Sequence, residues 1–169
     1  QIVASLDEVG RDVFAKKAAR WDENHEYPWE NIEILKELGV LGMTIPEAYG
    51  GQESPLIDAV LAIETTAKYC GVTARVIVET NMGALGCVMA YGTDDQRKLV
   101  AQRILEEGDK PAIGMTEPEA GTALTDLSAT AEKKGDSYII NGTKHWITGG
   151  GVSVSNLIFV RFMEDGKDL

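Results

Sequence analysis

The chain has 169 residues, of which 44% are hydrophobic and 25% are charged, a composition typical of a folded globular protein and not of a disordered one. Twenty-seven acidic residues outnumber sixteen basic ones, so the formal net charge at pH 7 is −11. Because a field of this sign repels a phosphate backbone, the composition argues against nucleic-acid binding.

The cysteines and the N-terminus say where the protein is expected to work. Cys70 and Cys87 stand alone, with no Cys-x-x-Cys or Cys/His cluster beside them, so we expect reduced thiols, no disulfide and no metal site. No apolar run approaches the roughly 18 residues of a membrane span, and QIVASLDEVGRD is acidic where a signal peptide is positive. We expect no membrane partner and a cytoplasmic location, or the mitochondrial matrix in a eukaryote. Because the chain starts without Met, a targeting segment before Gln1 stays open.

Helices are predicted over about the first hundred residues. In residues 2–21 the apolar side chains recur at steps of three and four, which places them on one helical face. Thr93 and Gln96 form a capping-box pattern that predicts the start of another helix. The remaining helices are expected at residues 29–38, 56–70, 73–92 and 97–107.

Beyond residue 108 the period changes toward two and the turn signals change with it. Asn141-Gly142 is typical of a two-residue hairpin, and Gly135-Asp136 marks a second turn. We therefore expect an antiparallel meander and an α+β fold, with a helical domain at residues 1–109 and a sheet domain at residues 110–169. The expected strands lie at residues 111–115, 127–133, 137–140, 143–148 and 155–163.

Residues 114–127, GMTEPEAGTALTDL, follow a short buried strand and resemble neither a strand nor a helix. Small residues, hydroxyls and successive backbone N–H groups suit an anion or a polar heterocycle. An ordinary surface turn is the alternative. Glu117 and Glu119 are expected to be exposed, and we assign neither to acid–base chemistry.

A second candidate loop is KHWITGGG, residues 144–151. A flat ring could stack on Trp146 while the glycines let backbone approach closely, although tryptophan in a strand is also common in plain core. We expect His145 to be a surface or packing residue. Two loops at the ends of strands in one small sheet together indicate a cofactor cradle.

MTEPEAGT followed by GDSYIINGTKHWITGG resembles the acyl-CoA dehydrogenase family of flavoproteins, in the usual order and separation. GMTIPEAYGG and YGTDDQRKLV are similar to the family's N-terminal turns, so the resemblance covers the whole chain. It implies an N-terminal helical domain, a middle β-barrel and a C-terminal four-helix bundle. This chain would hold the first domain and about half of the barrel, without the bundle.

The resemblance implies FAD as cofactor and an acyl-CoA as substrate. Thr116 would hydrogen-bond the flavin, Thr122 would serve both FAD and the CoA moiety, and Trp146 would flank the ring. The family's catalytic glutamate belongs to the C-terminal domain, so no residue here is predicted to be the base. The implied FAD-binding residues are Ile113, Gly114, Met115, Thr116, Gly121, Thr122, Trp146, Ile147 and Thr148.

The chain departs from the usual family pattern at Ala123, where most members have Asp, and at Gly149, where they have a polar residue. These departures, with GDKPAI and an arginine before an apolar helix, resemble the 3-sulfinopropionyl-CoA desulfinase branch. That branch keeps FAD, replaces the catalytic glutamate and releases sulfite to give propionyl-CoA. The equivalent of Arg75 would hold the sulfinate.

From the residues alone, Arg75 has two interpretations. It can pair with Glu79 one helical turn on, an arrangement that contributes a few tenths of a kcal/mol on a helix surface. Its planar guanidinium can instead bind the anionic end of a short acyl chain bidentately, which would disfavour fatty acyl tails. For Glu79 we place the salt bridge ahead of an acid–base role.

Three functions therefore remain open. Two are α,β-dehydrogenation, which would pass electrons to an electron-transfer flavoprotein, and desulfination. The third is a non-catalytic binding or assembly protein that keeps the fold. The family also implies a homo-oligomer, and the chain by itself is expected to show no turnover.

Overall fold

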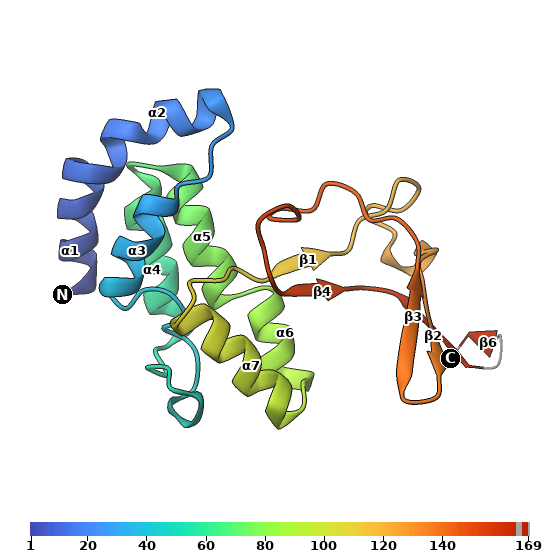
Figure 1. The fold of residues 1–169 in the computed structure, drawn as a ribbon. Coiled ribbons are helices and arrows are strands. Elements are labelled where there is room, and N and C mark those ends of the chain that lie inside the picture. Colours follow the sequence, from blue (N-terminus) through green and yellow to red (C-terminus); the bar gives the residue numbers. More distant parts are fainter. Residues whose placement is uncertain (165–166, 169) are drawn as a thin grey trace. The chain divides into compact units, whose positions relative to one another are not determined.

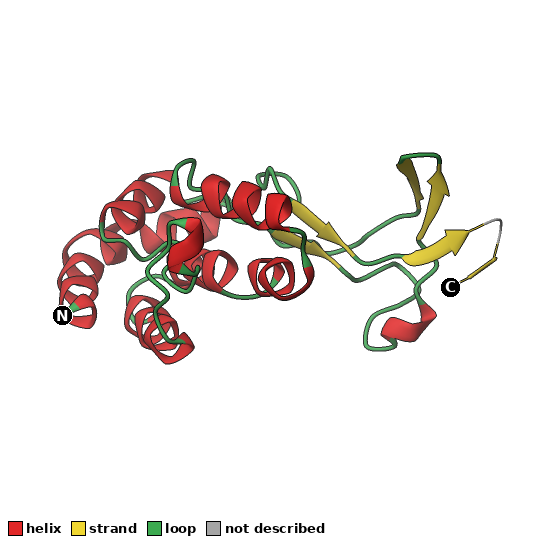
Figure 2. Cartoon of the chain, turned by 90° about the horizontal axis from the view of Figure 1, so that it is seen from below, coloured by secondary structure: helices red, strands yellow, loops and turns green. Residues whose placement is uncertain are grey.

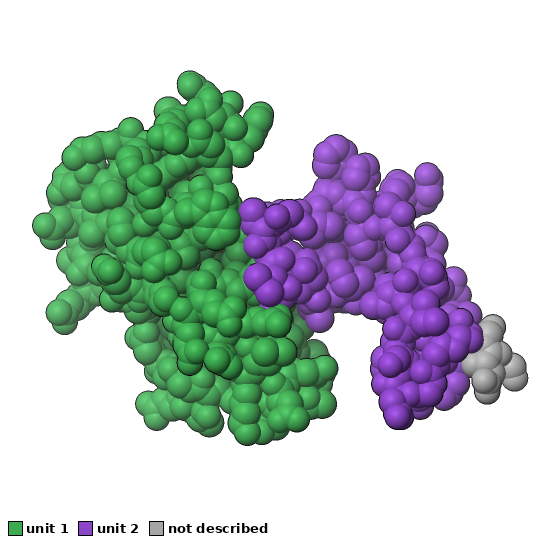
Figure 3. Space-filling view, viewed as in Figure 1, with its two compact units in different colours: residues 1–111 green, residues 112–169 purple. Residues whose placement is uncertain are grey.

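The protein is described here by a computed structural model of residues 1–164 and 167–168 (Figure 1). The chain packs as two compact units, residues 1–111 and 112–169, coloured separately in Figure 3. Figure 2 shows helices in the first unit and strands in the second, apart from a 3₁₀ turn at Leu124–Asp126. A helical unit followed by a sheet unit confirms the predicted α+β class. Among the described residues, no helix is both long and apolar enough to cross a bilayer.

In the first unit, prolines or a capping box mark the starts of several helices: Pro28 precedes α3, Pro55 precedes α4 and Thr93 caps α7. Thr93 Oγ1 accepts from the Gln96 backbone N–H and the Gln96 side chain accepts from the Thr93 N–H, which confirms the predicted capping box. The helices are α1 (Ile2–Val9), α2 (Ala15–Asn24), α3 (Trp29–Glu37), α4 (Leu56–Ala67), α5 (Gly71–Asn81), α6 (Ala84–Tyr91) and α7 (Asp94–Leu105).

Between α1 and α2 the backbone runs as a π-helical turn, Gly10–Phe14, so that residues 2–24 form one continuous helical segment. Gly10 packs so closely on the Tyr69 ring that a Cβ would lie 2.2 Å from Tyr69 Cδ2. The Tyr69 hydroxyl donates to Asp7 Oδ1 at 2.8 Å. The Tyr69 ring can therefore pack against this helical segment because Gly10 has no side chain.

The single helix predicted over residues 73–92 is wrong, because α5 and α6 are separate. Gly83 between them has φ 56° and ψ −119°, a conformation that is accessible to glycine and strained for other residues. The apolar pattern continues across the break because both helices face the same core.

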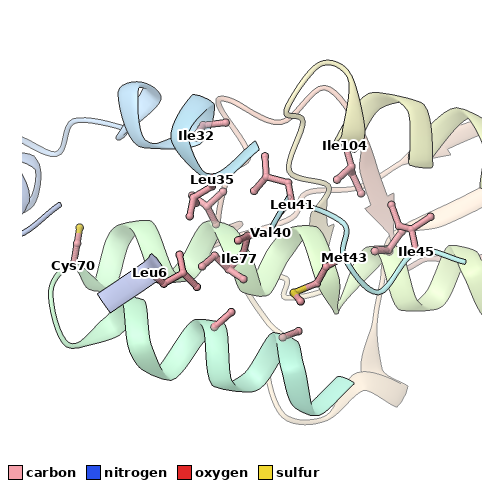
Figure 4. Packing of buried hydrophobic residues seen from close by; sticks show 14 of the residues in the cluster. Leu6, Ile32, Leu35, Val40, Leu41, Met43, Ile45, Cys70, Ile77 and Ile104 are labelled. Atoms are coloured by element: carbon pink, nitrogen blue, oxygen red, sulfur yellow. The ribbon is translucent and has the colours of Figure 1, made fainter. Parts of the chain in front are cut away.

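The core of the first unit takes buried side chains from all of its α-helices and from the loop that follows α3. Figure 4 shows Leu6, Leu35 and Ile77 converging from three helices, and all three are fully buried. The loop is held from α5 by Asn81, whose Nδ2 donates to Val40 O at 2.9 Å and whose Oδ1 accepts from Thr44 N at 3.1 Å. The position of α5 is thus fixed on several sides, and α5 carries Arg75 and Glu79.

The second unit has two small sheets. β1 (Ala112–Gly114) pairs in parallel with β4 (Asn156–Ile158). The other sheet has the order β3-β2-β5-β6, in which β2 and β5 are parallel and the outer pairs antiparallel. Its strands are β2 (Thr130–Lys134), β3 (Ser137–Asn141), β5 (Arg161–Glu164) and β6 (Lys167–Asp168). Within the described residues these sheets are open and form no closed barrel.

The predicted antiparallel meander is therefore wrong in its second half. The hairpin at Gly135-Asp136 forms, but Asn141-Gly142 makes no hairpin and residues 143–148 form no strand. Gly142, with φ 145°, lies against Ala129 so tightly that a Cβ would come within 2.5 Å of the Ala129 Cβ. The chain packs on Ala129, the residue before β2, at this point instead of pairing back along β3.

The strand predicted at residues 155–163 is divided into β4 and β5. Phe159 N donates to Gly114 O at 2.9 Å, and Arg161 N donates to Ala129 O at 2.8 Å. The bond to the β1 side and the bond to the β2 side are therefore only two positions apart in the chain. Strand β4 ends and β5 begins where the pairing changes from β1 to β2. The local apolar pattern does not reveal this change.

Candidate functional site

The predicted cradle at residues 114–127 is a tight turn followed by an exposed loop. Glu117 N donates to Ala120 O at 2.9 Å and Ala120 N donates to Glu117 O at 3.2 Å, which closes a loop through Pro118 and Glu119. Gly121 and Thr122 follow on the surface, and a Cβ at Gly121 would meet no atom within 4 Å. The turn therefore presents Gly121 and Thr122 to open space.

Glu117 does not lie on the surface, and the prediction of two exposed carboxylates is wrong for this residue. It is 3% exposed, and its carboxylate accepts from Ser128 N at 2.6 Å, Ser128 Oγ at 2.7 Å and Ala129 N at 3.0 Å. Lys144 Nζ donates to Glu117 Oε1 at 2.7 Å. This ammonium, helped by the Ser128 donors, lowers the pKa of Glu117 to about 2. Glu119 is exposed, as predicted.

Lys144 and His145 join the second predicted loop to the first. Lys144 Nζ also donates to Met115 O at 3.1 Å, so one ammonium holds both the carboxylate and the backbone of the turn. His145 N donates to Thr116 O at 2.8 Å. The two loops that the sequence indicates as a joint cradle are thus hydrogen-bonded side by side within the second unit.

Trp146 stands next to this junction in an unusual conformation. Its φ is 57°, in the left-handed region that costs a residue with a Cβ about 1 kcal/mol or more, and 81% of the residue is exposed. The imidazole of His145 stacks on the indole at 4.2 Å between ring centroids. An exposed indole on a strained backbone is unfavourable for stability alone, and such outliers gather at ligand sites.

The other predicted cofactor residues differ in how open they are. Ile113, Met115 and Thr116 are half-buried, whereas Gly114 is buried inside the β1–β4 pair, where its carbonyl accepts from Phe159. Thr148 is exposed, and Ile147 is half-buried with its carbonyl bonded to Gly150 N. Of the predicted cofactor residues, Gly121, Thr122, Trp146 and Thr148 are therefore exposed to a ligand, and Thr116 is accessible only in part.

In the first unit, Arg75 and Glu79 form the ion pair that one interpretation predicts. Arg75 Nε donates to Glu79 Oε1 at 3.0 Å, and the Arg75 side chain is 55% exposed. The Glu79 side chain is 7% exposed and has a second cation, Lys110, whose Nζ lies 2.9 Å from Oε2. The pair is thus part of a network with two buried members, Glu79 and Lys110, and not an isolated surface contact.

Lys110 is held from a second side by Tyr27. Its Nζ lies 4.7 Å from the centre of the Tyr27 ring, a cation–π contact in a buried setting. Burial raises the pKa of the Tyr27 phenol above its ordinary value, and the carboxylates of Glu79 and Asp109 add to the shift. No described group bonds to the buried Tyr27 hydroxyl.

Sequence reasoning missed two cations of these clusters, Lys110 and Lys144. Each is the partner of a buried carboxylate that lies 31 or 27 positions earlier in the chain. Neither has a local signal, since Lys110 follows a helix end and Lys144 sits in an irregular segment. A buried cation of this kind is found only when the fold brings its carboxylate beside it.

Comparison with known proteins identifies the family. The protein-family model for the acyl-CoA dehydrogenase N-terminal domain matches residues 1–107. The family model for the acyl-CoA dehydrogenase middle domain matches residues 112–168. The chain therefore belongs to the acyl-CoA dehydrogenase family, as its motifs predict.

Among its relatives are proteins named 3-sulfinopropanoyl-CoA desulfinase. The chain is 49% identical to the one from Variovorax paradoxus over 98% of this chain, and 46% identical to the one from Paraburkholderia xenovorans over 99%. A probable medium-chain specific acyl-CoA dehydrogenase of Caenorhabditis briggsae is 34% identical over 89% of the chain. The chain spans about two-fifths of the length of these relatives.

Solved structures share the fold. Butyryl-CoA dehydrogenase from Megasphaera elsdenii matches with a TM-score of 0.86 at 28% identity, over 95% of this chain and 43% of its own. A glutaryl-CoA dehydrogenase from Mycobacterium smegmatis, solved in complex with FADH2, matches with a TM-score of 0.85 at 23% identity, over 99% of this chain and 42% of its own. At that second identity the likeness concerns the fold alone.

Proposed function

We propose that the full-length protein carrying this chain is an FAD-containing enzyme that removes sulfinate from 3-sulfinopropanoyl-CoA or a similar short, anionic acyl-CoA. The observation that carries the proposal is the hydrogen bond from His145 N to Thr116 O, which joins the two predicted cofactor loops beside an exposed Trp146. The names of the relatives at 45–49% identity support the substrate class.

The loop residues suit a flavin. Trp146 offers an apolar face for a flat ring, and Thr116, Thr122 and Thr148 offer hydroxyls within the segments that flank it. When bound, FAD would supply an electron acceptor of adjustable potential. The part of this chain would be to bind and orient the flavin through these groups.

Arg75 would select the acyl group. It is a permanent cation on the buried helix α5, and its guanidinium has the planar geometry that matches a sulfinate or carboxylate. In the overall reaction the C–S bond breaks, water contributes its oxygen to sulfite, and a proton takes the place of sulfur on carbon. Arg75 would hold the leaving group while this happens.

The first test combines a spectrum with a product assay. The purified full-length protein should be yellow, should release sulfite from 3-sulfinopropanoyl-CoA, and should keep its oxidised-flavin band when butyryl-CoA is added. A colourless protein that takes up no FAD would overturn the proposal in favour of a non-catalytic binding or assembly protein.

The second candidate function is α,β-dehydrogenation of a short acyl-CoA, favoured by the relatives named acyl-CoA dehydrogenase at 31–34% identity. In that case butyryl-CoA bleaches the flavin band, no sulfite appears, and an electron-transfer flavoprotein is the expected partner. For either function we propose a cytoplasmic homo-oligomer, or a matrix one in a eukaryote, and no turnover by residues 1–169 alone.

A further inference from the structure

In the network of Arg75, Glu79 and Lys110, two side chains are buried and one is exposed. Glu79 and Lys110 have side chains that are 7% and 6% exposed, whereas Arg75 is 55% exposed. Each oxygen of the Glu79 carboxylate is assigned to one cation, Oε1 to Arg75 at 3.0 Å and Oε2 to Lys110 at 2.9 Å. A buried carboxylate with both oxygens engaged is a fixed anchor for the exposed guanidinium.

The bond to Arg75 uses Nε and leaves the outer edge of the guanidinium available. Among the described residues, Glu79 is the one carboxylate that pairs with Arg75. Because the guanidinium is planar, a bond at Nε restricts the direction in which both terminal nitrogens point. Those two nitrogens form the fork that binds a carboxylate or sulfinate bidentately.

Lys110 adds a second positive charge beside Glu79. A single carboxylate beside Arg75 would cancel the positive charge that attracts an anion. With Lys110 included, two cations and one anion give the three side chains a net charge of +1. The Tyr27 ring, 4.7 Å from Lys110 Nζ, keeps this second cation in place.

We propose that Glu79 and Lys110 are positioning residues that aim Arg75 at the anionic end of the acyl chain and thereby set the preference for anionic over neutral acyl-CoA. The inference rests on the proposed function, since it requires Arg75 to contact the substrate. It goes further by assigning specificity to two buried side chains that do not touch the substrate.

The experiment measures dissociation constants by calorimetry on the full-length flavin-loaded protein, with succinyl-CoA as the anionic probe and butyryl-CoA as the neutral one of equal length. Replacing both buried charges, Glu79→Met with Lys110→Met, removes the anchor without leaving an unpaired charge in the core. We expect succinyl-CoA to bind about tenfold more weakly, as for loss of a charge-assisted bond, and butyryl-CoA to change less than about twofold.

Three companion variants separate positioning from a purely structural role. Glu79→Gln with Lys110→Met restores an acceptor for Arg75 Nε and should recover most of the succinyl-CoA affinity. In an Arg75→Ala background the double methionine replacement should change succinyl-CoA binding less than about twofold, because the group being aimed is gone. Glu132→Met with Lys134→Met, on an exposed pair of β2, is the matched control and should leave both constants unchanged.

The outcomes distinguish the inference from the proposed function. If the unsubstituted protein binds no FAD, or binds both acyl-CoAs equally, the proposed function fails and this inference with it. If Arg75→Ala abolishes the preference for succinyl-CoA but the double methionine replacement retains it, the positioning role alone is overturned. Equal weakening of both probes by the double replacement also overturns it, since that result would indicate a structural role.

Discussion

At the scale of single residues, Glu117 lies in a segment whose sequence is typical of an exposed turn, yet its buried side chain holds neighbouring segments together. Proline and a second glutamate follow it, yet its carboxylate is buried and accepts from Ser128, Ala129 and Lys144. These contacts join three separate stretches of the second unit: the turn after β1, the start of β2 and the segment before Trp146. The geometry of the candidate flavin site thus depends on a residue that need not touch the flavin.

The depressed pKa of Glu117 predicts a pH dependence with a definite sign. Its value of about 2 lies below the ordinary 4.5, so the folded state favours the carboxylate and the unfolded state binds the proton more readily. The stability that Glu117 contributes is complete above about pH 4.5 and is lost as the pH falls toward 2. We expect the urea midpoint, read from the amide signals of Ser128 and Ala129, to drop across this window.

Glu117→Gln should lower that midpoint at neutral pH and flatten its dependence between pH 4.5 and 2. Glu119→Gln is the matched control, because Glu119 is exposed in the same turn, and should behave as the unsubstituted chain. Parallel pH curves for the Glu117→Gln variant and the unsubstituted chain would contradict the assignment.

Trp146 is expected to serve ligand binding more than folding. Trp146→Gly relieves about 1 kcal/mol of left-handed strain and adds a similar entropic cost of glycine, so the free energy of unfolding should stay within about 1 kcal/mol. The flavin content of the purified full-length protein should fall strongly. His145→Ala keeps the backbone bond to Thr116 and should retain flavin; a large loss of stability in Trp146→Gly would instead indicate a structural indole.

At the scale of elements, the junction of α5 and α6 allows a comparison between two glycines. Gly83→Ala forces a Cβ into φ 56°, ψ −119° and should lower the free energy of unfolding by about 1–3 kcal/mol. Gly86→Ala, three residues on inside α6 where a Cβ meets no atom within 4 Å, should raise it by about 0.5–1 kcal/mol. Opposite signs in thermal or urea unfolding would support the break at Gly83, and equal signs would contradict it.

The elements also show what local sequence can predict. The caps and periods of α1 to α4 and α7 involve neighbours within one or two turns, so helices at these places follow from sequence alone, as Thr93 and Gln96 illustrate. β4 and β5 do not, because Leu157 pairs with Ile113 and Phe162 with Ala131, residues that lie far apart in the chain. The candidate site divides in the same way, since the loops and Arg75 are visible in the sequence but Lys110 and Lys144 are not.

At the scale of the whole molecule, the two units differ in how well each covers its own apolar surface. The helical unit has a closed core that includes Phe14, Leu35 and Ile77, all fully buried. In the sheet unit all five residues of β3 are exposed, among them Ile139 and Ile140. Because burial of apolar side chains supplies most of the stability, the helical unit should be the more stable part of this chain.

Hydrogen exchange on the 169-residue chain tests this difference. The amides of α5, which lie between α3 and α4 and carry Val76 and Ile77, should open only with the unit as a whole. The amides of β3, which among the described residues pairs with β2 on one side only, should exchange on the order of 100-fold faster, equivalent to about 2.7 kcal/mol less protection. Equal protection of α5 and β3 would mean that the two units unfold together, and the stability of the candidate flavin loops would then derive from the helical core.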